Sequence, residues 1–259
     1  MNTLLNRVYS DYFMPSRLDK YEELLVRAID NGFAQTSVRS LFQLIIDGLA
    51  LPDKFLMHRH DIDTDIETAR KLFVIEKRLN IKSSFYFRLK TLDFKFMKEI
   101  EEYGSEASYH YEEIATFAKR NRLRTVTEVR ERLVEIRCEF SNNFHAIEKQ
   151  LGRKLTTVAS HGDFVNRRLN FANTEILACH DLRANCGISC EAYDKKLLNV
   201  FDIYISDKPY PQHFFPMSPF QAIEEKARIC LLTHPRQWKT NWVENSKDNL
   251  LRIKEGLSW

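Results

Sequence analysis

The chain has 259 residues, of which 44% are hydrophobic and 29% charged, a composition typical of a globular protein that buries a sizeable core. Its 39 basic and 36 acidic residues are scattered and give a net charge of +3, so no basic run indicates nucleic-acid binding. We expect a single domain over residues 1–259, because one α/β barrel has about this length.

The sequence carries no signal for export or for a membrane. The first 17 residues contain no uninterrupted apolar stretch behind a basic start, so they do not predict a secretory signal. No segment is long and apolar enough to cross a bilayer. The five cysteines form no pair of the C-x-x-C type, which favours buried free thiols in a reducing compartment. We therefore expect a cytoplasmic protein.

The N-terminal part of the chain shows a helical pattern. Residues 18–51 repeat apolar side chains at helical spacing, in two runs separated by Gly32. We predict that residues 1–53 form an N-terminal helical cap packed on the main domain. A short apolar stretch at 55–57 then predicts a strand that leads into the polar segment 58–63.

The next segments alternate between helical and strand patterns. A helix is predicted at 66–79, and the aromatic and β-branched run 81–87 predicts a strand. A second helix at 92–103 ends before Gly104, which is a C-cap signal, and 105–111 is short enough for the next strand. This alternation indicates β-α-β units and a parallel sheet.

The second half of the chain continues the pattern with a longer outer helix. Residues 126–150 predict one exposed amphipathic helix. Three further strands are predicted at 156–160, 200–205 and 229–233. The proline-rich stretch 209–219 predicts a rigid surface loop that borders a binding cleft.

Histidine or aspartate residues follow several of these strands. Parallel α/β sheets place their sites at the carboxyl ends of the strands, so these side chains are candidates for one site. They are Asp61, Asp63, His110, His161, Asp207 and His234.

Asp61 and Asp63 are the most informative pair. Alternate side chains of a strand share a face, so both carboxylates are expected to point into the same cleft. Two carboxylates this close repel each other, and a cation beside them relieves the repulsion. The alternative is that these aspartates cap helix 66–79 and that His58 and His60 pack or face solvent.

The order of the motifs resembles the polysaccharide deacetylase superfamily, in the subgroup whose first motif reads H-D-V-D. The resemblance extends from residue 55 to residue 238 and is carried by HDID at 60–63, IKSSFYF at 81–87, EASYHYE at 106–112, SHG at 160–162, YISD at 204–207 and LLTHP at 231–235. It implies a deformed seven-stranded β/α barrel that holds one divalent metal ion, usually zinc.

The resemblance also implies roles for individual residues. Asp61 matches the general base that takes a proton from water, and Asp63 matches the metal-binding aspartate. His110 matches the first metal-binding histidine. His234 matches the general acid that protonates the leaving amine.

One position departs from the family pattern. The family usually has a second metal-binding histidine four residues after the first, and here that position is Ile114, which cannot bind a metal. His161 is our choice for the missing ligand, because it ends a different strand and can point into the same barrel mouth. His60 and His58 are the fallback ligands, and loss of the metal is a further alternative.

The residue types meet the requirements of amide hydrolysis without reference to a family. An amide is a poor electrophile, so its hydrolysis benefits from a Lewis acid and a hydroxide-like nucleophile, which a metal supplies. Two imidazoles and one carboxylate are a known catalytic zinc set. A histidine titrates in the range needed to protonate the leaving amine.

We therefore predict a metal-dependent deacetylase of an N-acetylated sugar, in lipopolysaccharide O-antigen or other surface polysaccharide synthesis. Asp207 is expected to bind a sugar hydroxyl or to orient His234, although an aspartate after a strand is more often a turn former. The rivals are a metal-free carbohydrate-binding protein, favoured by Ile114, and an amidohydrolase acting on a small non-sugar amide. The sequence leaves the oligomeric state open.

Overall fold

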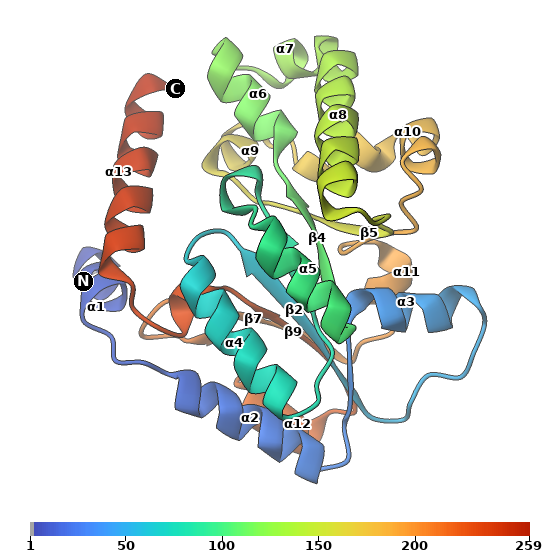
Figure 1. Cartoon of the computed structure of the whole chain (residues 1–259). Helices are drawn as coiled ribbons and strands as arrows, with labels where there is room; N and C mark the ends of the chain where they lie inside the picture. The colour runs from blue at the N-terminus through green and yellow to red at the C-terminus, as the bar shows by residue number, and fades with distance from the viewer. Residues whose placement is uncertain (1–2) are drawn as a thin grey trace.

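The computed structural model describes residues 3–259, which form one mixed α/β domain (Figure 1). Within this range nine strands form one sheet in the order β6-β5-β4-β3-β2-β9-β7-β8, with β1 also paired to β2. Every pairing is parallel except that of β7 with β8. The strands are β1 Ala34–Thr36, β2 Phe55–Ile62, β3 Ser84–Phe87, β4 Glu106–Tyr111, β5 Thr157–Ser160, β6 Cys190–Glu191, β7 Ile203–Asp207, β8 Phe214–Phe215 and β9 Arg228–Thr233.

The sheet curls into a half-barrel. Its outer strands are β6 and β8, and no pairing between them closes the sheet in the part of the chain that the structure describes. The α/β class and the parallel sheet are confirmed, but a closed seven-stranded barrel is not. Both outer strands have only two residues, which is too short to extend the ladder further around.

Helices cover the outside of the sheet. In order of contact, α12, α2, α4, α5, α8 and α6 form a continuous layer (Figure 1). The last helix, α13, contacts the first, α1, and the N-terminus lies near the start of α13 (Figure 1). The α-helices are α1 Thr3–Tyr12, α2 Leu18–Asp30, α3 Val38–Ile46, α4 Ile66–Arg78, α5 Phe94–Tyr103, α6 Glu113–Asn121, α7 Val126–Glu131, α8 Leu133–Leu151, α9 Phe164–Leu169, α10 His180–Asn185, α11 Lys195–Leu198, α12 Pro219–Glu225 and α13 Trp242–Ser258. Short 3-10 helices lie at Leu89–Thr91, Asn173–Ala178 and Pro235–Gln237.

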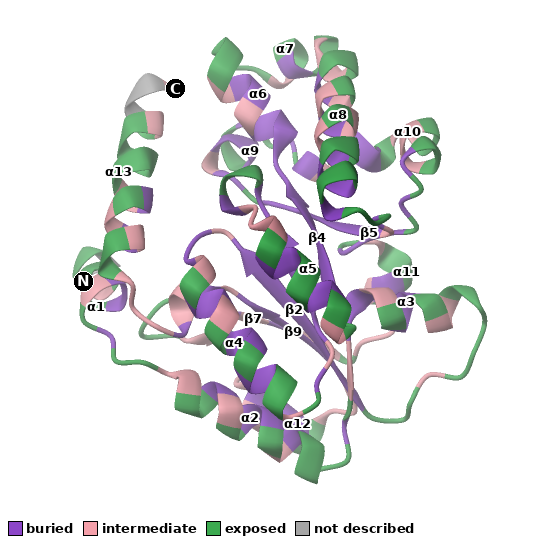
Figure 2. Ribbon diagram, viewed as in Figure 1, coloured by how far each residue is buried: buried purple, intermediate pink, exposed green. Residues whose placement is uncertain are grey.

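The central strands lie in the middle of the core. Every residue of β2, β3 and β4 is buried, and Figure 2 shows these strands in purple beneath helices that are exposed on their outer faces. Parallel strands covered by helices are buried in this way. Because even the polar residues of β2 are buried, each of them needs a partner within the protein.

Local signals set several helix boundaries. Asp65 is the N-cap of α4 and accepts a hydrogen bond from the Thr68 backbone N–H at 3.2 Å. The alternative that Asp61 or Asp63 caps this helix is therefore wrong. Gly104 ends α5 in the left-handed conformation with φ 93°, as its C-cap position predicts.

Two predicted boundaries differ from the structure. The single helix expected at 126–150 is divided at Arg132 into α7 and α8. The apolar pattern hides this break, because Val129 and Ile136 are both buried on either side of it. Within the expected N-terminal helical cap, residues 34–36 form strand β1, which pairs with β2. Three residues are too few to show a periodic pattern.

Candidate functional site

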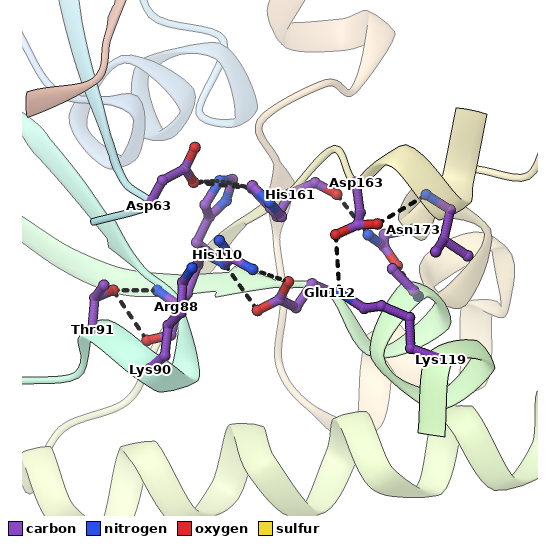
Figure 3. A network of polar contacts seen from close by, with 12 residues as sticks. Asp63, Arg88, Lys90, Thr91, His110, Glu112, Lys119, His161, Asp163 and Asn173 are labelled. Atoms are coloured by element: carbon purple, nitrogen blue, oxygen red, sulfur yellow. Dashed lines mark hydrogen bonds and ion pairs between the residues drawn. The ribbon is translucent and has the colours of Figure 1, made fainter. Parts of the chain in front are cut away.

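The candidate residues meet at one edge of the sheet. Asp61 lies near the end of β2 and Asp63 just after it, His110 lies near the end of β4, and His161 and His234 follow β5 and β9. Because these four strands run parallel within one curled sheet, their carboxyl ends lie at the same edge. Figure 3 shows Asp63, His110 and His161 pointing toward one another.

Three ligand-type atoms form a small triangle. His161 Nδ1 lies 3.0 Å from Asp63 Oδ1, and His110 Nε2 lies 3.3 Å from the same oxygen. The two ring nitrogens are 3.3 Å apart. A tetrahedral zinc ion with ligands at about 2.0–2.2 Å places its ligand atoms roughly 3.3–3.5 Å from each other. The three residues could therefore hold a metal ion.

The hydrogen bonds around the triangle leave its lone pairs available. His110 Nδ1 donates to the Ala159 carbonyl at 2.9 Å, which turns Nε2 of the ring toward the triangle. Burial lowers the pKa of His161, which favours its neutral form. Asp63 Oδ1 is buried without a hydrogen bond of proper geometry, despite the two nearby nitrogens. Such an orphaned oxygen fits a metal ligand.

Asp63 is ionised in this setting. Burial by itself would raise the pKa of its carboxyl, but the His161 and His110 rings hold that pKa well below its usual range. One carboxylate and two imidazoles thus converge in the triangle.

Asp61 has a different partner. The buried Arg59 guanidinium donates from Nε and Nη2 to its two carboxylate oxygens, both at 2.8 Å. Burial favours the neutral acid, but Arg59 and His110 outweigh it and lower the pKa of Asp61. Asp61 Oδ2 still lies 3.4 Å from His110 Nε2, so this carboxylate borders the triangle. No pattern in the sequence indicated the role of Arg59, which pairs with Asp61 within the same strand.

His234 is held by Asp207. Its Nδ1 donates to Asp207 Oδ1 at 2.6 Å, and its backbone N–H donates to Oδ2 at 2.7 Å. Trp238 Nε1 also donates to Oδ2 at 3.0 Å. Burial alone would lower the pKa of His234, but Asp207, with Asp63 and Asp61, raises it to about 9. The imidazole is therefore protonated at neutral pH.

These contacts bear on the expected role of Asp207. Its side chain has no exposed surface, and both oxygens accept hydrogen bonds from His234 or Trp238. Of the two roles expected for Asp207, these contacts favour the orientation of His234 over the binding of a sugar hydroxyl.

The fallback ligands point elsewhere. His60 contacts Thr233 Oγ1 at 2.6 Å through Nδ1 and Glu76 Oε1 at 2.7 Å through Nε2. His58 Nε2 contacts Gln35 Oε1 at 2.6 Å, and burial lowers the pKa of His58 to about 4. Both rings are committed to buried polar contacts outside the triangle.

Ile114 lies in the hydrophobic core. It is fully buried in α6 and belongs to the largest apolar cluster. The usual position of the second metal histidine therefore supplies packing here, and His161 from the neighbouring strand reaches the triangle.

A second set of ligand-type residues adjoins the first. Glu112 and Asp163 lie close to His161 (Figure 3). Arg88 Nε donates to Glu112 Oε1 at 2.9 Å, and Lys119 Nζ lies 3.1 Å from Asp163 Oδ2. Both carboxylates are thus already paired with cations, which disfavours a second metal ion there.

The site opens into a cleft of about 720 Å³. Asp63 and His234 line it, and Pro209, Tyr210 and Pro211 form part of its border. The prediction that the proline-rich loop borders a cleft is confirmed. The volume lies within the range of small-molecule sites, about 300–1,000 Å³.

The chain was compared with known proteins, and no protein-family model and no curated protein matches its sequence. Among the described residues, no helix has both the length and the apolar character needed to span a membrane. Any function assigned to the site rests on its geometry and on the sequence motifs.

Proposed function

We propose that this chain is a metal-dependent N-deacetylase of the polysaccharide deacetylase type, which removes the acetyl group from an N-acetylated sugar. The observation that supports it is the convergence of Asp63 Oδ1, His110 Nε2 and His161 Nδ1 within 3.3 Å of one another. From the resemblance of the motif order we propose, further, that the reaction is a cytoplasmic step of surface polysaccharide synthesis, such as that of lipopolysaccharide O-antigen.

Asp63, His110 and His161 would hold one divalent ion, for which we propose zinc. Two imidazoles and a carboxylate form a catalytic zinc set that leaves a coordination position open. When bound, such an ion polarises the acetyl carbonyl and lowers the pKa of a water molecule. The remaining chemistry requires a proton acceptor and a proton donor, for which the chain has Asp61 and His234 near the triangle.

Asp61 is the proposed proton acceptor. Arg59 keeps its carboxylate ionised and fixes its orientation through two hydrogen bonds. Asp61 takes a proton from the water whose oxygen attacks the acetyl carbonyl carbon. This step forms the new C–O bond.

His234 is the proposed proton donor. It is protonated at neutral pH, and it lines the cleft beside Asp63. The sugar nitrogen takes the His234 proton as the C–N bond breaks, and the products are acetate and a free amino sugar. Asp207 positions the imidazole and stabilises its positive charge.

The test combines metal analysis with acetate release. Protein purified without chelator is expected to contain about one divalent ion per chain and to release acetate from N-acetylated sugars. His110→Ala should lose both properties, since it removes a corner of the triangle. His180→Ala, which changes an exposed histidine outside the site, is the matched control and should retain both.

Two outcomes would favour the rival functions. A wild-type protein that binds N-acetylated sugars without containing metal would be a carbohydrate-binding protein. Acetate or ammonia release from small amides, without release from any sugar, would indicate a different amidohydrolase. Full metal content in His110→Ala would show that the ligand assignment is wrong.

A further inference from the structure

The cleft beside the triangle continues into a second one. The first has a volume of about 720 Å³ and the second about 600 Å³. Both are lined by Arg7, Asp63, Arg167 and Arg252, so they adjoin at the proposed metal ligand Asp63. Each cleft alone is large enough for a small-molecule ligand. A single N-acetylated sugar ring would leave much of this space unfilled.

The walls of the two clefts carry more positive than negative charge. Arg7 and Arg236 share Asp11, while Arg236, Arg252 and Lys90 share Asp248. Four cations are therefore matched with only two carboxylates. All four cations line one cleft or both.

Three further cations on these walls have no carboxylate partner within the range that the structure describes. Arg167 lies on α9 and lines both clefts, and Lys208 directly follows Asp207 and lines the first. Arg168, also on α9, lines the second cleft, where its guanidinium lies over the Phe164 and Trp259 rings. The other acidic wall residues also contact basic side chains: Asp163 and Glu255 share Lys119, and Asp207 contacts His234. Over both clefts, eight Arg and Lys side chains and six Asp and Glu side chains line the walls. The wall therefore retains uncompensated positive charge next to the site.

We propose that the N-acetylated substrate carries a phosphate ester, as a mono- or diphosphate, which Arg167 and Lys208 bind beside Asp63. This inference rests on the proposed deacetylase function. Guanidinium groups donate to phosphate oxygens in pairs, and several cations around one cleft match a multiply charged anion better than a single carboxylate. The second cleft then receives the group attached beyond the phosphate. Nucleotide and lipid carriers share this chemistry.

Binding is tested separately from catalysis. Inorganic pyrophosphate and UDP-N-acetylglucosamine are titrated into the full-length protein by calorimetry. Arg167→Gln and Lys208→Gln should each weaken binding about tenfold or more, the loss expected for one charge-assisted hydrogen bond. Arg78→Gln and Lys149→Gln change exposed cations on α4 and α8, outside both clefts, and should bind as the wild type does. Equal binding by the cleft variants and the controls would overturn the inference.

The catalytic arm identifies the carrier. Acetate release is compared for N-acetylglucosamine, its 1-phosphate, UDP-N-acetylglucosamine and a short-chain prenyl diphosphate N-acetylglucosamine. A higher kcat/KM for any phosphorylated substrate supports the inference, provided that Arg167→Gln removes this preference by raising KM. The phosphorylated substrate with the highest kcat/KM then shows whether the carrier is a nucleotide or a lipid. Equal kcat/KM for the neutral sugar overturns it but leaves the deacetylase proposal intact. Another outcome is that the protein binds pyrophosphate through Arg167 but releases acetate from none of these substrates. That result would overturn the deacetylase proposal and support the anion-binding site alone.

Discussion

Asp61 and Asp63 are two residues apart and both reach His110, yet their surroundings differ. Arg59 binds both oxygens of Asp61, whereas Asp63 presents a buried oxygen without a hydrogen bond. A carboxylate already satisfied by a guanidinium is a poor candidate for a metal ligand, and an orphaned one is a good candidate. In our proposal, Asp61 therefore transfers the proton and Asp63 binds the metal ion.

Asp61→Asn tests this division. The variant keeps an acceptor oxygen for Arg59 but cannot take a proton, so turnover should fall about a hundredfold or more while metal content stays near that of the wild type. Metal analysis and acetate release on the same preparation make the comparison. Loss of the metal in this variant would instead identify Asp61 as a ligand.

The His234–Asp207 pair predicts a pH dependence. The pKa of His234 is raised to about 9, so the imidazole holds its proton through neutral pH and loses it as the pH rises through about 9. Activity that requires this proton should therefore fall as the pH rises through about 9, which gives the pH profile an alkaline limb.

The raised pKa of His234 also stabilises the folded state. This stabilisation is fully present below the unfolded pKa of about 6.5 and is lost as the pH rises through about 9.

Asp207→Asn should move this alkaline limb to lower pH, because it removes the charge that raises the pKa of His234. The profile of kcat/KM against pH, from acetate release, measures the shift. Asp53→Asn, at an exposed position outside the site, should leave the limb unchanged. An unchanged limb in Asp207→Asn would show that His234 is not the group that titrates.

At the scale of elements, α6 places a packing residue where the polysaccharide deacetylase pattern has a histidine. Ile114 is buried against the core, and His161, after β5, takes the third corner of the triangle. The adjacent pairing of β4 with β5, with His110 opposite Ala159, brings the two histidines together. The proposed ligand set is therefore completed by a residue that follows the neighbouring strand, and not by one placed a helical turn after His110.

Ile114→Ala should destabilise the protein by about 2–5 kcal/mol, as expected for a large-to-small change in a packed core. Urea unfolding measures this loss. Metal content of the folded variant should remain unchanged, because no ligand is touched. A fall in metal content at normal stability would mean that this position acts on the site and not on the core.

At the scale of the whole molecule, the triangle exists only in the folded chain. Asp63, His110 and His161 come from three strand ends spread over about a hundred residues. A ligand that binds the folded state alone stabilises it, by roughly 4 kcal/mol at a thousandfold excess over Kd. Binding of the proposed metal ion would therefore stabilise the folded state.

Chelator treatment should accordingly lower Tm by several degrees, and returning zinc should restore it. Differential scanning calorimetry of the wild type and of His110→Ala provides the measurement. The variant should show no response to chelator, because its site is incomplete. An equal chelator response in both proteins would mean that the metal binds elsewhere.

Local patterns in the sequence determined much of this protein. The apolar runs predicted strands that end near Asp61, His110, His161 and His234, and the helical periods predicted most of the outer layer. Parallel pairing then required these strand ends to share one edge. The resemblance to the polysaccharide deacetylase pattern implied Asp63 and His110 as ligands, and the end of a further strand indicated His161 in place of Ile114.

Only the tertiary structure decided the partners. Asp65, not Asp61 or Asp63, caps α4, and Arg59 pairs with Asp61. The contact of His234 with Asp207 joins residues from β7 and the end of β9, which adjoin because the sheet places these strands side by side. Such contacts depend on strand order and on how the sheet curls, and neither is encoded in the period of a single segment.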